Sequence, residues 1–112
     1  MTARAPQRFG MIARLRPERR EEYFELHANV WPGVAATITQ CGIRNFTIYS
    51  LGDVIVGYYE YVGDDFEADQ RRMAADPVTQ EWWSRTAPCQ LPFEPDSGEP
   101  NWQLMTEAWH QD

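Results

Sequence analysis

The chain has 112 residues, a formal net charge of −7 at pH 7 and a pI near 4.7. This length predicts one domain over residues 1–112, with residues 1–7 as a loose N-terminal extension and no room for a separate cofactor domain. The acidic balance argues against a nucleic-acid partner, and the absence of an apolar run near ~20 residues or of a secretory signal predicts a cytoplasmic chain without membrane contact.

The first part of the chain predicts a strand followed by a kinked helical connection. Apolar residues alternate with other residues over 8–15, which is the period of a strand. Pro17 is typical of a first helical position, so we expect a helix over residues 17–29. Pro32 interrupts it, because the residue before a proline is disfavoured in the α conformation. A second helical segment then runs to Gly42, which is suited to a left-handed cap.

The middle of the chain predicts a hairpin. Residues 43–50 and 54–61 are rich in β-branched and aromatic side chains, and the turn residues 51–53 separate them. Asp64 or Asp65 is then placed to cap the next helix.

The last part of the chain predicts a second kinked helix, a loop and a final strand. The helix carries Phe66, Met73 and Ala74 inward and restarts at Pro77, giving a segment over residues 77–86. A proline-rich loop over residues 88–100 follows, and residues 102–109 alternate again as a last strand.

This order, β-α-β-β-α-β, predicts an α+β, ferredoxin-like fold with a four-stranded antiparallel sheet and both helical connections on one face. The strands carry large residues that we expect on both faces of the sheet, for example Phe46, Ile48, Tyr58 and Trp109. We therefore expect a second copy to cover the open face, giving a homodimer of the dimeric α/β-barrel type.

The first candidate catalytic pair is Tyr23 and His27. Their spacing of four puts a phenol and an imidazole on one face of the predicted helix, within reach of one small molecule. Two groups that can pass protons on one face favour acid/base chemistry. Taken alone, a helical histidine more often packs or faces solvent, and Glu22 and Glu25 are either the solvated side of the helix or groups that orient the imidazole.

Aromatic residues form the second group of candidates. Trp82 and Trp83 point about 100° apart on a helix, so both cannot face the core. A platform that stacks on a sugar ring and a dimer interface are equally good accounts of them. Phe46 and the strand tyrosines 49, 58, 59 and 61 could address a polyol ligand, although each one separately is more often a core residue.

Motifs for other chemistries are missing from the sequence. Cys41 and Cys89 have neither CxxC spacing nor a nearby histidine pair, which indicates two free thiols and no metal site. There is no glycine-rich phosphate loop, no G-x-S-x-G and no H-E-x-x-H. These absences leave two possibilities: cofactor-free chemistry on a small neutral ligand, or no catalytic activity.

Several motifs together resemble the L-rhamnose mutarotase family. The resemblance runs in order from Arg8 to Trp109 and rests on Glu21-Glu22-Tyr23, His27, Trp31-Pro32, Asn45-Phe46-x-Ile48-Tyr49, Trp82-Trp83 and Glu107-Ala108-Trp109. It implies a small cytoplasmic ferredoxin-like protein that dimerises through its sheet, needs no metal or other cofactor, and interconverts the α and β anomers of a deoxy sugar.

By position, the resemblance implies that His27 is the proton donor and that Tyr23, Trp82 and Trp83 contact the sugar. Phe46 stands where the family has a substrate-contacting tyrosine, so L-rhamnose is the leading substrate, with L-fucose or another 6-deoxy sugar left open. Phe46 and Tyr49 complete the predicted substrate-binding set.

The mechanism predicted from these residues has His27 protonate the ring oxygen while Tyr23 or a bound water handles the anomeric hydroxyl. A cofactor-free monooxygenase or haem-degrading protein on the same dimeric scaffold is one alternative, and a non-catalytic sugar-binding module is another.

Overall fold

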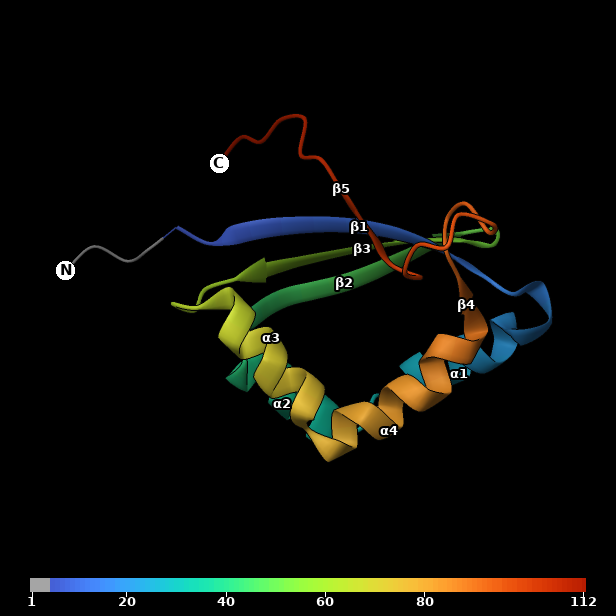
Figure 1. The fold of residues 1–112 in the computed structure, drawn as a ribbon, viewed down its shortest axis with the longest axis horizontal. Coiled ribbons are helices and arrows are strands. Elements are labelled where there is room, and N and C mark those ends of the chain that lie inside the picture. The colour runs from blue at the N-terminus through green and yellow to red at the C-terminus, as the bar shows by residue number, and fades with distance from the viewer. Residues whose placement is uncertain (1–4) are drawn as a thin grey trace.

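A computed structural model describes residues 5–112 of the chain (Figure 1). Residues 1–4 of the predicted N-terminal extension lie outside the described part, and Gln7 already belongs to the first strand. The elements are β1 (Gln7–Leu15), a 3-10 turn η1 (Pro17–Arg19), α1 (Arg20–Ala28), α2 (Pro32–Gln40), β2 (Ile43–Leu51), β3 (Val54–Tyr61), α3 (Phe66–Ala75), α4 (Pro77–Thr86), a 3-10 turn η2 (Ala87–Cys89), β4 (Gln90–Leu91) and β5 (Gln103–Met105).

The strands form one antiparallel sheet in the order β2-β3-β1-β4, with β5 also paired to β1. The four helices lie together on one face of this curled sheet (Figure 1). The predicted α+β ferredoxin-like arrangement is confirmed, with each helical connection made of two helices, α1–α2 and α3–α4. Among the described residues, no helix combines the length and apolar character needed to cross a membrane.

The predicted last strand over residues 102–109 is wrong in its extent, and a strand within the predicted loop was missed. β4 and β5 lie on the same edge of β1: Leu91 pairs with Arg14, and Gln103 pairs with Ile12. The fourth strand is therefore one strand split in two by residues 92–102, which we call the excursion. Beyond Met105 the chain has no regular structure.

Prolines and aspartates set the helix boundaries; the break at Pro32, the restart at Pro77 and a cap at Asp65 were predicted, whereas the cap at Asp76 was not. Pro32 and Pro77 begin α2 and α4, where the missing N–H of proline costs no helical hydrogen bond. The carboxylate of Asp65 accepts from the Ala68 N–H at the start of α3, and that of Asp76 accepts from the Thr79 N–H at the start of α4. Gly42, with φ at 83°, ends the first helical connection in the left-handed conformation.

The buried residues form two clusters rather than one. The first contains Ala13, Leu15, Tyr23, Ile55 and Cys89, and the second contains Cys41, Ile43, Tyr61 and Met73. Met73 points inward from α3 as predicted and Phe66 packs against the second cluster, but Ala74 is exposed, because α3 turns only one side toward the sheet.

A β-bulge in β2 aims one side chain at the interior. Arg44 pairs with Glu60 and Thr47 with Tyr58, so Asn45 and Phe46 together stand opposite Tyr59. Asn45 has φ at 54°, a conformation that asparagine tolerates better than most residues. Its side-chain amide donates to Glu60 Oε1 at 3.1 Å, which helps to hold the bulge. Bulges of this kind re-aim side chains next to functional sites.

The outer face of the sheet, opposite the helices, carries its own apolar residues. Tyr49, Leu51 and Met105 are 67%, 86% and 43% exposed there, and Tyr58 lies among them through its pairing with Gly10. Of the residues predicted to show large side chains on both faces, Phe46 and Ile48 in fact point toward the helices. Trp109 lies beyond the last strand.

Candidate active site

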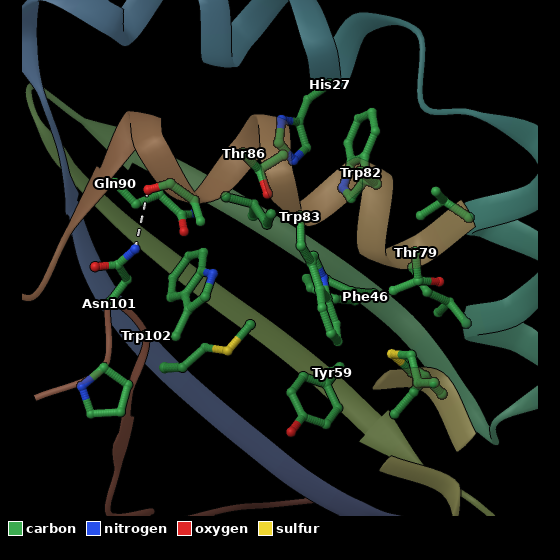
Figure 2. A pocket seen from close by; sticks show the side chains of 18 of the residues that line it. His27, Phe46, Tyr59, Thr79, Trp82, Trp83, Thr86, Gln90, Asn101 and Trp102 are labelled. Atoms are coloured by element: carbon green, nitrogen blue, oxygen red, sulfur yellow. Dashed lines mark hydrogen bonds between the residues drawn. The ribbon is translucent and has the colours of Figure 1, made fainter. Parts of the chain in front are cut away.

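A cavity of about 470 Å³ lies between the helices and the inner face of the sheet, and residues of both core clusters line it. Figure 2 shows the side chains around it. None of the residues that line it in the described chain carries a formal charge at neutral pH. They are Met11, Tyr23, His27, Val34, Ile38, Ile43, Phe46, Ile48, Tyr59, Gln70, Met73, Thr79, Trp82, Trp83, Thr86, Ala87, Gln90, Pro100, Asn101 and Trp102. The size is ordinary for a small-molecule site, and the neutral lining suits an uncharged ligand.

Tyr23 and His27 face this cavity together from α1. Their ring centroids are 4.3 Å apart, as expected from a spacing of one helical turn. Tyr23 is only 2% exposed, and its hydroxyl oxygen accepts a hydrogen bond from Gln90 Nε2 at 3.2 Å. Burial raises the pKa of Tyr23 to about 12, although the bond from Gln90 opposes the rise. Tyr23 is therefore a neutral phenol at physiological pH.

The imidazole of His27 is oriented by its own helix. Its Nδ1 lies 2.9 Å from the backbone carbonyl oxygen of Tyr23, which can only accept, so Nδ1 carries the proton. Burial lowers the pKa of His27 below the usual 6.5, and the same hydrogen bond partly opposes the shift. Glu22 does not orient the ring, because its carboxylate lies beside the Cys89 thiol.

The two adjacent tryptophans have different environments. Trp82 is buried and meets both His27 and Trp31 edge to face, with centroids 5.3 and 5.2 Å apart. Trp83 is 41% exposed and also lines the cavity, where Figure 2 shows it beside Phe46. Trp82 thus fixes the imidazole, while Trp83 offers an accessible aromatic surface.

Phe46 reaches the cavity, but Tyr49 does not. The bulge turns Phe46 toward Tyr59, with ring centroids 5.7 Å apart. Residues three apart on a strand point to opposite faces, so Tyr49 pairs with Val56 on the outer face of the sheet. Tyr49 is accordingly absent from the lining and is removed from the predicted substrate-binding set.

Polar side chains that sequence reasoning missed also line the cavity, among them Thr86, Gln90 and Asn101. Gln90 lies in a two-residue strand inside a segment expected to be a loop, and no local pattern singles it out. The Asn101 amide donates to the Ala87 carbonyl at 3.2 Å, which ties the excursion to the end of α4 (Figure 2).

Trp102 was assigned to the last strand, but it lies at the end of the excursion and packs against the first core cluster. Gly57 on β3 gives room to the neighbouring Met11, since a Cβ there would lie 2.8 Å from Met11 Cε, whereas its distance of 3.6 Å from the Trp102 indole would be an ordinary contact.

The two cysteines are free and buried in different clusters. Within residues 5–112, no group of three or more histidine, cysteine or acidic side chains is arranged to hold a metal ion.

Comparison with known proteins gives consistent matches. A family model described as L-rhamnose mutarotase matches residues 8–111. An L-rhamnose mutarotase of Oceanobacillus iheyensis is 27% identical over 106 residues, which cover 95% of this chain and 99% of that protein.

Solved structures agree on the fold. The crystal structure of an L-rhamnose mutarotase from Formosa agariphila superposes with a TM-score of 0.73 at 16% identity, covering 95% of this chain and 99% of the other. Tetracenomycin F2 cyclase from Streptomyces glaucescens, a type II polyketide cyclase, superposes with a TM-score of 0.65 at 18% identity, with the same coverage. At such identities the likeness concerns the fold alone.

Proposed function

The chain belongs to the L-rhamnose mutarotase family, and we propose that it is an isomerase that interconverts the α and β anomers of L-rhamnose or a related 6-deoxy sugar. The observation that carries this proposal is the cavity itself. A phenol and an imidazole, ring centroids 4.3 Å apart, face one uncharged cavity of suitable size. Acid/base chemistry on a neutral ligand is what such a pair can perform.

Anomer exchange requires two proton movements. The ring oxygen must gain a proton and the anomeric hydroxyl must lose one as the C1–O5 bond breaks; the aldehyde then rotates and closes on its other face. Tyr23 and His27 are the proposed catalytic residues because both can pass protons inside the cavity. No electrons are transferred, so the reaction itself requires no redox cofactor.

The remaining lining suits a deoxy sugar. Trp82 and Trp83 are proposed to contact the sugar, with the exposed face of Trp83 against its C–H groups. Phe46 and Tyr59 provide an apolar wall for the methyl group. The amide of Asn101 and the hydroxyl of Thr86 are polar groups within the same cavity that can address sugar hydroxyls.

We further propose that the protein is a homodimer joined through the outer face of the sheet. Tyr49 and Leu51 are strongly exposed on that face, and two such faces can bury each other in an isologous contact. Light scattering tests this: the wild-type mass should be twice that of the chain, and Leu51→Asp should give a monomer. A monomeric wild type would contradict the proposal. The cytoplasmic location stays a prediction.

The first test of the activity is saturation-difference proton NMR on the anomeric signals of L-rhamnose and L-fucose, with and without protein. Exchange above the protein-free rate is expected, and His27→Ala should lose roughly 10²-fold or more of it while remaining folded by circular dichroism. A folded His27→Ala with full activity would remove His27 from catalysis. No enhancement for any 6-deoxy sugar would refute the proposed function.

A further inference from the structure

We propose that two hydrogen bonds divide the roles of acid and base at this site: Tyr23, held by Gln90, protonates the ring oxygen, while His27 takes the proton of the anomeric hydroxyl. Gln90 is a positioning residue in this scheme, because it acts through Tyr23. The inference rests on the proposed mutarotase function. It also reverses the sequence-based hypothesis, in which His27 was the proton donor.

The role of His27 follows from its tautomer. Nδ1 donates to the Tyr23 carbonyl oxygen at 2.9 Å within the same helix. A neutral imidazole carries one proton, so Nε2 is left as a lone pair. His27 lines the cavity, and Figure 2 shows its ring pointing into it near Thr86. The group offered to a ligand is therefore a proton acceptor.

The role of Tyr23 follows from the partner of its hydroxyl. Gln90 Nε2 donates to the Tyr23 oxygen at 3.2 Å, which occupies one lone pair and leaves the O–H proton for a ligand in the cavity. The same amide N–H stabilises the phenolate that forms when this proton leaves. The hydrogen bond from Gln90 thus leaves the O–H proton of Tyr23 for the ligand and stabilises the phenolate that remains after its transfer.

The position of Gln90 is fixed by the split edge strand. Gln90 pairs with Leu15 of β1 and is 7% exposed. The carbonyl of the preceding residue, Cys89, accepts from the Arg16 N–H at 2.8 Å. The backbone N–H of Gln90 itself donates to the Ala87 carbonyl. The backbone is held in this way, and the side-chain amide is buried with its hydrogen bond to Tyr23.

The surroundings of His27 favour the neutral imidazole. The side chains that share the cavity with it from the helices, the sheet and the excursion are uncharged, and Tyr23 on α1 and Tyr59 on β3 are the titratable groups among them. The Cys89 thiol is turned toward Glu22 and the Arg85 carbonyl.

Both groups are neutral before the sugar reacts, because burial raises the pKa of Tyr23 and lowers that of His27. The opposite assignment needs an imidazolium and a phenolate already in the resting enzyme.

The proposed step balances its protons and electrons. His27 Nε2 takes the anomeric O–H proton, the O–H electron pair forms the C1=O bond, and the C1–O5 pair leaves on the ring oxygen, which receives the Tyr23 proton. The open-chain aldehyde lies between imidazolium and phenolate. After rotation about C1–C2, both protons return and the ring closes as the other anomer.

The tautomer can be measured directly. The chain has two histidines, so nitrogen-15 NMR with His110→Gln as the assignment control isolates His27. We expect the Nδ1–H tautomer at neutral pH. An Nε2–H tautomer, or a charged ring at pH 7.5, would overturn the proposal.

The wild-type pH profile gives a second test. Catalysed exchange of L-rhamnose, corrected for protein-free exchange at each pH, should be constant at neutral pH and fall on the acid side, through the lowered pKa of His27. A rate that rises toward acid pH would mean that imidazolium is the donor and would refute the assignment. Absence of catalysed exchange at every pH would instead refute the proposed function.

Substitutions at Gln90 test its positioning role. The Gln90→Glu carboxylate would accept a hydrogen bond from the Tyr23 O–H and turn that proton away from the ligand, so we expect exchange to fall at least roughly 10-fold at neutral pH. Gln40→Glu, the same change at an exposed position, should behave as wild type.

A neutral substitution covers the case in which Gln90→Glu fails to fold. Gln90→Met removes the N–H donor without adding charge, and its kcat should fall roughly 10-fold with KM nearly unchanged, because the lost bond matters most when the phenolate forms. A folded Gln90→Met with wild-type kcat would refute the role of Gln90.

Discussion

Removal of the Trp102 side chain tests the wall that the excursion adds to the cavity. Trp102 packs against the cluster of Ala13, Leu15, Tyr23, Ile55 and Cys89, although part of its ring stays accessible. Truncation of a fully buried tryptophan to alanine typically costs 3–5 kcal/mol. For this partly exposed ring we expect Trp102→Ala to lower the free energy of unfolding by about 2–3 kcal/mol, or roughly 10 °C in Tm for a domain of this size.

Thermal unfolding followed by far-UV circular dichroism measures this loss, with all proteins at one concentration because self-association would raise Tm. Trp109→Ala is the matched control, since Trp109 is 77% exposed and its removal should change stability by less than about 0.5 kcal/mol. The same two variants, assayed for anomer exchange below the unfolding transition, should differ: Trp102→Ala should raise KM for the sugar and Trp109→Ala should not.

Equal unfolding temperatures for Trp102→Ala and Trp109→Ala would refute the reasoning, because they would mean that Trp102 adds no packing energy. An unchanged KM in Trp102→Ala would separately show that its ring does not bound the space that the substrate occupies.

Three further predictions concern other parts of the molecule. Phe46→Tyr should change the ratio of the L-rhamnose and L-fucose exchange rates by up to roughly 10-fold, since one sugar gains a hydrogen bond; an unchanged ratio in the NMR assay would mean that the ring does not meet a hydroxyl that differs between them. Burial lowers the pKa of His27 below 6.5 in the folded state, so the unfolded chain binds the proton first as pH falls. Wild-type stability should therefore drop below pH 6.5 more steeply than that of His27→Gln in urea titrations, and parallel curves would contradict this. Asp76→Ala removes the acceptor of both the Thr79 N–H and its hydroxyl, so its Tm should fall, whereas Asp96→Ala in the exposed loop should leave Tm unchanged.

The sequence predicted the helices and the long strands well because local chemistry determines them. Pro77 starts a helix at the predicted residue, Pro32 separates two helices as predicted, and β3 has its predicted bounds. Residues 17–19 of the predicted first helix form a 3-10 turn instead. The edge strand could not be predicted in the same way. Gln90 and Leu91 are too short a segment to show alternation, and their strand exists because β1 offers a free edge.

In the candidate site too, residues positioned by local structure could be predicted, and residues positioned by long-range pairing could not. Tyr23 and His27 could be paired from their spacing alone, because a helix fixes which residues share a face. Strand alternation could also have separated Tyr49 from Phe46, yet both were assigned to the site. Gln90 and Trp102 carry no local signal, since the long-range pairing of β4 and β5 with β1 brings them to the cavity.

The split fourth strand has a consequence for how such a protein can be altered. The excursion leaves β1 opposite Arg14 and returns opposite Ile12, so its two ends rejoin the same ladder two residues apart. A segment inserted in this way can change in length and composition without shifting the register of the sheet, and longer loops cost little additional closure entropy. Residues 92–101 can therefore be exchanged to redesign the cavity wall that Pro100 and Asn101 provide, while Trp102, Tyr23, His27 and the strands that support them stay in place.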